Sequence, residues 1–162
     1  PLSDFQFRNI TKEAVLSICK KTKEKLGQTP LLIKVGYFSN DQQQLLEDII
    51  KSVLPYISGI CAINTIPAQV VDKDGKQALP GKGRLVAGIC GVSIKWAGLD
   101  MVKRLDAIRK KQGYNFAIIG VGGVMSPEDY LEYRNAGADV VQSSTGAMWN
   151  PNLAQEIKQL TN

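Results

Sequence analysis

Two patterns of apolar residues alternate along this chain. Short runs rich in apolar residues occur at 31–36, 59–64, 117–119 and 139–142, and each predicts a β-strand. Elsewhere apolar residues recur every three or four positions, which predicts helices over about 11–26, 39–54, 94–111, 127–135 and 150–160. Strands that alternate with helices imply parallel pairing through right-handed crossovers.

The first half of the chain carries three local expectations. The helix over 11–26 should stop at Gly27 and bury one face. That face is expected to carry Ala14, Val15, Ile18 and Cys19. The run at 31–36 is continuously apolar except for one lysine, which is typical of a strand buried on both faces of a sheet.

The segments outside these elements are expected to lack regular structure. Residues 1–10 show no periodicity and should be irregular. Residues 66–87 form a long connection that contains a hairpin-type turn signal at 72–76. Connections of this length are usually functional or act as lids.

Four strand–helix units amount to half of a (β/α)8, or TIM, barrel, although a small doubly wound sheet has a similar count. Candidate functional residues follow every strand rather than one switch point, which favours the barrel. The expected fold is therefore α/β, with parallel (β/α) units that form a half-barrel and a single domain over 1–162. Because the chain opens at Pro1 without a methionine, we expect a fragment of a longer domain.

Two successive strand ends carry glycines or hydroxyl residues. The first, Gly120-Val121-Gly122-Gly123, precedes Ser126-Pro127-Glu128-Asp129, which predicts a helix start. Backbone N–H groups beside the positive end of a helix dipole suit a phosphate. The second, Ser143-Ser144-Thr145-Gly146, comes about twenty residues later. Together they predict one phosphate held between two loops, although such glycines can also serve only to make tight turns.

Three single side chains could also carry chemistry. Lys34 interrupts an apolar strand, so its ammonium must reach solvent or meet an anion. Asn64 ends a strand and either bonds a planar amide in both directions or begins a turn. Cys90 lies beside glycines and is either a reactive thiol or a small residue that fits.

Composition narrows the classes of function. The net charge is +5, but the basic runs at 20–25 and 109–111 lie at helix ends without interleaved aromatic residues, which argues against nucleic-acid binding. The chain has no His, which excludes imidazole catalysis and imidazole metal ligands. Its three cysteines lack metal or disulfide spacing, so we expect no metal and a reducing, cytoplasmic location. No run is long and apolar enough to span a membrane.

Five motifs follow one another in a fixed order. They are Leu32-Ile33-Lys34-Val35, Ile63-Asn64-Thr65, Gly88-Ile89-Cys90-Gly91, Ile119-Gly120-Val121-Gly122-Gly123-Val124, and Ala136-Gly137-Ala138-Asp139-Val140-Val141-Gln142 with Ser144-Thr145-Gly146. In this order and spacing they resemble the C-terminal half of dihydroorotate dehydrogenases, which are FMN-dependent (β/α)8 barrels. The resemblance covers nearly the whole chain from about residue 30.

The resemblance implies a role for each candidate residue. Lys34 would contact the flavin ring at its electron-rich pyrimidine edge. Asn64 would bind the pyrimidine substrate, Thr65 would lie beside both substrate and FMN, and Gly91 would lie against FMN. The FMN phosphate would be held by Gly122, Gly123, Ser144 and Thr145.

The implied activity is the oxidation of dihydroorotate to orotate in pyrimidine biosynthesis. The family's general base is a Ser or Cys after an earlier barrel strand, upstream of the residues present here. No catalytic residue is therefore assigned in this chain, and the chain alone is expected to be inactive. In the whole protein that base would take a proton from C5 while C6 gives a hydride to the flavin.

Other interpretations remain open. The segment 87–91 departs from the family's Gly-Gly-x-Ser-Gly, and the connection through Asp74-Gly75 and Pro80–Gly83 is similar to dihydropyrimidine dehydrogenase, which acts on uracil or thymine. A non-catalytic phosphate- or flavin-binding half-barrel and a barrel that grips a phosphorylated sugar are further alternatives. A half-barrel exposes two sheet edges, so we expect homo-oligomers or pairing with the missing half.

Overall fold

The computed structural model describes residues 11–161; the segment 1–10, expected to be irregular, lies outside these residues. The helices are α2 (Lys12–Leu26), α3 (Gln43–Val53), α4 (Lys95–Gln112), α5 (Pro127–Asn135), α6 (Thr145–Trp149) and α7 (Leu153–Thr161), with short 3-10 turns η1 (Asn40–Gln42) and η2 (Val92–Ile94). The strands are β1 (Leu32–Val35), β2 (Gly59–Ala62), β3 (Ile66–Gln69), β4 (Val86–Ile89), β5 (Ala117–Val121) and β6 (Val140–Gln142).

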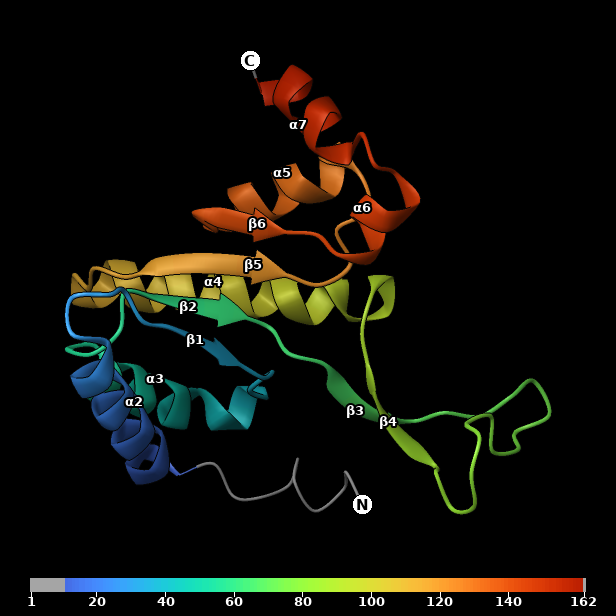
Figure 1. The fold of residues 1–162 in the computed structure, drawn as a ribbon, viewed down its shortest axis with the longest axis horizontal. Coiled ribbons are helices and arrows are strands. Elements are labelled where there is room, and N and C mark those ends of the chain that lie inside the picture. The colour runs from blue at the N-terminus through green and yellow to red at the C-terminus, as the bar shows by residue number, and fades with distance from the viewer. Residues whose placement is uncertain (1–10, 162) are drawn as a thin grey trace.

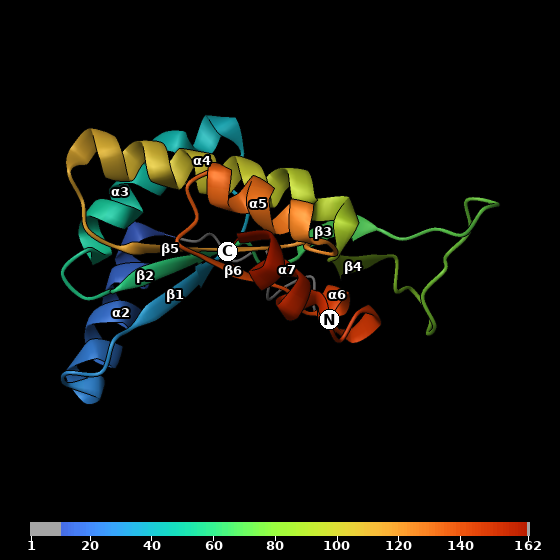
Figure 2. The same cartoon turned by 90° about the horizontal axis from the view of Figure 1, so that it is seen from above.

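Four of the strands form one parallel sheet, whose order β1-β2-β5-β6 follows the order of the chain. Helices α3, α4 and α5 lie on the same side of this sheet (Figures 1 and 2). A doubly wound sheet would reverse its strand order and place helices on both faces. The fold is thus an α/β partial barrel, as the sequence predicted.

The core lies between the sheet and these helices. It combines the inner stripes of α3 and α4 with the strand residues that point toward them: Leu46, Ile49, Ile50, Val53, Met101, Val102, Leu105, Ile60, Ala62 and Ile118. Burying one such aliphatic side chain contributes roughly 1.5–3 kcal/mol. The helix predicted over 39–54 is thus present as η1 and α3, and most apolar positions of α3 are buried.

No helix layer formed by residues 11–161 covers the opposite face of the sheet (Figure 2). Leu32 on β1 is 54% exposed, and Val140 on β6 is 50% exposed. Lys34, two residues after Leu32, points to the same face and is exposed. The expectation that the first strand is buried on both faces was therefore wrong among the described residues, because helices cover only one face.

The long connection is not a plain loop. β3 and β4 pair in antiparallel register from Ile66 with Ile89 to Gln69 with Val86, and this hairpin extends away from the sheet (Figure 1). The predicted turn is confirmed by a bridge between Val71 and Gln77. Asp72 closes it, because its carboxylate accepts hydrogen bonds from the N–H groups of Asp74 and Lys76, both at 2.9 Å.

Most helix boundaries match the sequence. Thr11 caps α2, Gly27 ends it, and α5 begins after Ser126 as expected. The predicted buried face of α2 was partly wrong: Cys19 is buried, but Ala14 and Ile18 are exposed. The five-residue helix α6 was not predicted. Within residues 11–161, no helix combines the length and apolar character needed to cross a bilayer.

Candidate functional site

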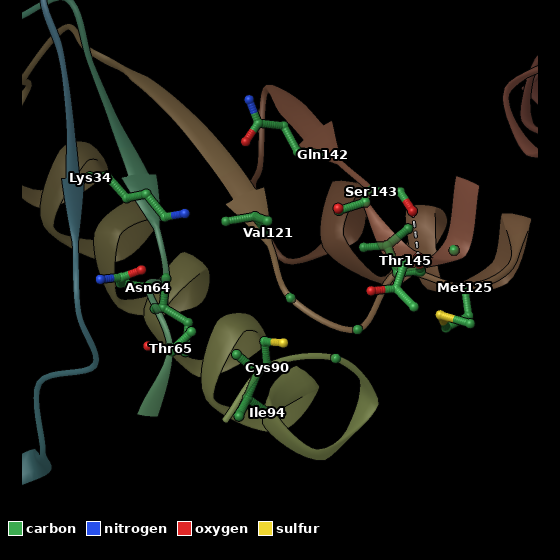
Figure 3. A pocket seen from close by; sticks show the side chains of 17 residues that line it. Lys34, Asn64, Thr65, Cys90, Ile94, Val121, Met125, Gln142, Ser143 and Thr145 are labelled. Carbon is green, nitrogen blue, oxygen red and sulfur yellow. Dashed lines mark hydrogen bonds between the residues drawn. The ribbon is translucent and has the colours of Figure 1, made fainter. Parts of the chain in front are cut away.

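A cavity of about 200 Å³ opens at the carboxyl ends of the parallel strands. Its lining includes every site residue that the sequence suggested: Lys34, Asn64, Thr65, Gly91, Gly122, Gly123, Ser144 and Thr145. Figure 3 shows Lys34 and Asn64 on one side, Ser143, Thr145 and Met125 on the other, and Cys90 and Ile94 beside the space between them. In parallel α/β folds this edge of the sheet is where ligands bind.

The backbone holds Lys34 and Asn64 at one end of the cavity. Lys34 is paired with Cys61 across the β1–β2 ladder, so its side chain leaves the same open face. The N–H of Asn64 donates to the carbonyl of Val35 at 2.8 Å, which ties the segment after β2 to the end of β1. A cation and a planar amide thus lie on neighbouring strand ends, where they can contact one flat polar ring.

Cys61 and Gln142 form a polar contact beside this end. The Cys61 thiol donates to Gln142 Oε1 at 3.6 Å across the open face. Burial raises the pKa of the Cys61 thiol above its ordinary value, and the charge of Lys34 opposes only part of that rise. The thiol is therefore protonated at neutral pH and acts as a donor rather than as a nucleophile.

The first glycine loop is held from behind by α5. The Tyr133 hydroxyl donates to the Gly122 carbonyl at 2.8 Å. Asp129 Oδ2 accepts from the N–H groups of Met125 and Ser126 at 2.7 and 3.0 Å. Burial raises the pKa of Tyr133 far above its ordinary value, so its hydroxyl stays a donor at every physiological pH.

Lys95 braces the same loop from the start of α4. Its ammonium forms ion pairs with Asp129 and, at 2.8 Å, with Glu132. Burial opposes the charge on Lys95, but these hydrogen bonds outweigh it and raise its pKa. A Cβ atom on Gly123 would lie 2.8 Å from Lys95 Cβ, so only glycine allows this close approach.

The second loop is tied directly to the first. Ser143 Oγ donates to the carbonyl of Val124 at 2.7 Å. A Cβ atom on Gly146 would lie 2.6 Å from that Ser143 oxygen, so the start of α6 also packs closely here. Within residues 11–161, the hydroxyl groups of Ser144 and Thr145 make no hydrogen bond and remain available to a ligand.

The unpaired backbone donors lie before α5 rather than at its first turn. In the described part of the chain, the N–H groups of Gly122, Gly123 and Val124 make no hydrogen bond. Ser126 and Asp129 cap the first turn of α5, so the N–H groups left for a ligand are those of the glycine loop beside that helix end. These N–H groups and the hydroxyls of Ser144 and Thr145 line the same cavity, and donors of both kinds suit an anion.

Thr65, Cys90 and Gly91, which flank the β3–β4 hairpin in the sequence, also line the cavity. Gly91 has φ +80°, and an added Cβ atom would meet nothing within 4 Å. A flat group can therefore approach its backbone directly. Gly88 packs against Thr65, since an added Cβ atom would lie 2.9 Å from Thr65 Cβ. Cys90 is exposed at the rim.

Sequence reasoning missed residues whose roles depend on tertiary contacts. Met125 and Gln142 line the cavity, while Tyr133 and Lys95 support it from outside. Nothing local in the sequence distinguishes Tyr133 from the other tyrosines. Among the described residues there is no group of three or more Cys, Asp or Glu side chains that could hold a metal ion.

Comparison with known proteins places the chain in a family. A family model described as dihydroorotate dehydrogenase matches residues 2–161. A dihydroorotate dehydrogenase of Dictyostelium discoideum is 35% identical over 146 residues, which cover 89% of this chain and 39% of the relative.

Two bacterial relatives are dihydroorotate dehydrogenases of different kinds. The catalytic subunit of dihydroorotate dehydrogenase B (NAD(+)) of Petrotoga mobilis is 31% identical over 91% of this chain and 46% of its own length. The dihydroorotate dehydrogenase (quinone) of Christiangramia forsetii is 30% identical over 98% of this chain and 44% of its own length. The chain thus spans less than half the length of each of these three relatives.

Proposed function

Because this chain belongs to the dihydroorotate dehydrogenase family, we propose that it is the part of such an enzyme that binds FMN and the pyrimidine substrate. The observation that carries the proposal is the cavity itself. Residues from four strand ends and from the segment after β4 meet there, and they include a cation, an amide, two free hydroxyls and three free N–H groups. These groups match a ligand that is flat and polar at one end and anionic at the other.

The chemistry of the lining residues suggests which part of FMN and substrate each end of the cavity would bind. The N–H groups of Gly122 and Gly123, with the hydroxyls of Ser144 and Thr145, would bind the FMN phosphate. Lys34 would place a positive charge beside the flavin ring, and the open space beside Gly91 would accept the ring. Asn64 and Thr65 would orient dihydroorotate through hydrogen bonds to its ring amides.

When bound, FMN supplies the redox chemistry, accepting a hydride from the substrate. The residues of this chain would bind, orient and polarise, and we assign none of them the role of general base. We propose that the other barrel strands and that base come from sequence outside this chain, since the matched segment covers only 39%, 46% and 44% of the three relatives. The expected reaction is oxidation of dihydroorotate to orotate.

Lys34→Ala in the complete polypeptide tests this assignment. The purified protein should show a flavin absorbance spectrum, and the variant should lower the two-electron midpoint potential of the bound flavin by roughly 30 mV, equivalent to one factor of ten in equilibrium constant. Loss of the lysine ammonium removes a positive charge that stabilises the reduced flavin more than the oxidised flavin, so the potential falls.

The matched control is Lys103→Ala. Lys103 is an exposed lysine of α4 that does not line the cavity, so this variant should leave the potential unchanged. A wild-type protein that neither contains flavin nor takes up added FMN would overturn the proposal. An unchanged potential in Lys34→Ala would remove Lys34 from the flavin site.

A further inference from the structure

The loop that carries the free N–H groups contains two consecutive glycines. Gly122 and Gly123 have φ values of +130° and +70°. A peptide unit between two glycines can turn over at little steric cost, since neither residue has a Cβ atom. If the unit turned over, a carbonyl oxygen would replace an N–H donor at the cavity and repel an anion. Something outside the loop must therefore select one orientation.

Tyr133 is placed to make that selection. Its side chain is fully buried, and it does not line the cavity. Cβ atoms added at Gly98 and Gly120 would each lie 3.1 Å from atoms of the Tyr133 ring, so α4 and β5 enclose the ring from two sides. Its hydroxyl donates to the Gly122 carbonyl at 2.8 Å from the α5 side of the loop.

The geometry of the peptide unit gives the consequence. The bond between Gly122 and Gly123 is trans, so its C=O and N–H groups point in opposite directions. A carbonyl held toward Tyr133 turns the Gly123 N–H away from α5. Two residues further along the chain, the carbonyl of Val124 accepts a hydrogen bond from Ser143 Oγ at 2.7 Å. The carbonyl oxygens of Gly122 and Val124 thus both accept hydrogen bonds from side-chain hydroxyl groups of the protein.

We propose that Tyr133 is a positioning residue, which fixes the Gly122–Gly123 peptide unit so that the Gly123 N–H donates to the phosphate of the bound ligand. The identity of that ligand as FMN rests on the function proposed above. The contribution is specific to the phosphate, because the unit directly precedes Val124, whose carbonyl is bonded to Ser143 beside Ser144 and Thr145, and Figure 3 shows Ser143 and Thr145 across the cavity from Lys34 and Asn64.

Tyr133→Phe tests the proposal, because it removes the hydroxyl and keeps the ring. In the complete polypeptide, stripped of flavin, we compare the affinities for FMN and for riboflavin, which lacks the phosphate. The Kd for FMN should rise about tenfold, as expected when a hydrogen bond to a charged group is lost. The Kd for riboflavin should stay within about twofold of wild type, since it makes no contact with this peptide unit.

Tyr130→Phe is the matched control. Tyr130 also lies on α5 and is half-buried, but its hydroxyl makes no hydrogen bond to any of residues 11–161. This variant should bind both flavins as wild type does. If Tyr133→Phe weakened FMN and riboflavin equally, the residue would be merely structural and the proposal would be wrong. An unchanged FMN affinity would overturn it as well.

A protein that binds neither flavin would refute the proposed function without deciding the role of Tyr133. Inorganic phosphate then serves as the probe, with the NMR signal of the Gly123 amide as the readout. A phosphate-dependent shift in wild type that is lost in Tyr133→Phe supports the proposal. An equal shift in both proteins, or none in wild type, overturns it.

Discussion

Asp129 joins three parts of the site through one carboxylate. Oδ2 accepts from the N–H groups of Met125 and Ser126, while Oδ1 pairs with the ammonium of Lys95 on α4. Its side chain is only 16% exposed, so solvent screens these bonds weakly. Burial alone would raise the pKa of this carboxyl, but the bonds outweigh it and the pKa is lowered.

Asp129→Asn should therefore destabilise the protein in a pH-dependent way. At pH 7 we expect a loss of about 2 kcal/mol in the free energy of unfolding, the usual size for a lost helix cap with charged hydrogen bonds. The pKa of the Asp129 carboxyl is lower in the folded protein than in the unfolded chain, where it is about 3.9. The ionised carboxylate therefore stabilises the fold at pH values above about 3.9, and this stabilisation is lost as the pH falls through the pKa of the folded state. The difference from wild type should persist to about pH 5 and shrink below pH 4.

Urea denaturation across this pH range is the measurement, with Asp41→Asn as the control. Asp41 is exposed in η1 and forms no ion pair with any of residues 11–161. Its variant should stay within about 0.5 kcal/mol of wild type at every pH. A difference for Asp129→Asn that does not change between pH 7 and pH 3 would contradict the ion-pair explanation.

At the scale of elements, a glycine follows the C-terminal end of both α4 and α5. The two glycines differ in how much space surrounds them. Gly113 ends α4 with φ +65° and would meet nothing within 4 Å if it carried a Cβ atom. Gly137 follows α5 with φ +110°, and an added Cβ atom would lie 2.6 Å from Asp106 Cβ. Asp106 is itself buried and paired with Arg109 and Lys110.

Gly137→Ala should accordingly cost more than Gly113→Ala. We expect about 3 kcal/mol for Gly137→Ala, which combines backbone strain with a clash in a packed region. Gly113→Ala should cost about 1 kcal/mol, because only the left-handed backbone is penalised. Thermal unfolding of both variants measures the contrast, and equal losses would mean that the contact with Asp106 relaxes freely.

Much of the element pattern could be predicted because its signals are local. Ser126 with Asp129 marks the start of α5, and Gly27 marks the end of α2. The hairpin β3–β4 escaped prediction because Pro67 lies inside β3 and the strands pair across a long separation. The exposed Ile18 shows a related limit, since periodicity does not say which side of a helix meets a neighbour.

The sequence predicted most residues that line the candidate site, but not the residues behind them that hold the loops in place. Lys34, Asn64 and the two loops lie at strand ends, where parallel topology brings them together. The hydrogen bond from Tyr133 to Gly122 has no sequence signal, because it depends on how α5 packs on β5. Tertiary contacts of this kind follow from the folded structure alone.

At the scale of the whole molecule, the uncovered face of the sheet sets the behaviour of residues 1–162 in isolation. Leu32 and Val140, each about half exposed, lie on the two outer strands β1 and β6. Open edges and an apolar face favour association. We therefore expect the isolated chain to dimerise or aggregate, and to become monodisperse when the remainder of the barrel is supplied.

Light scattering of the isolated chain checks this prediction. Leu32→Lys combined with Val140→Lys should reduce the associated fraction several-fold, since both charges point from the uncovered face. Ile18→Lys is the control, because Ile18 is 66% exposed on α2, away from the sheet. A stable wild-type monomer would contradict the prediction, and equal effects of the two changes would place the contact elsewhere.

The strand order also has a consequence for how the protein forms during synthesis. Each parallel strand joins the edge left by the strand before it, with one crossover between them. The sheet can therefore grow in the direction of translation, and no strand waits for a distant partner before it can pair. Ser144 and Thr145 leave the ribosome after the glycine loop and Tyr133. The proposed anion site would then be completed last, when Ser144 and Thr145 pack beside a glycine loop that has already folded.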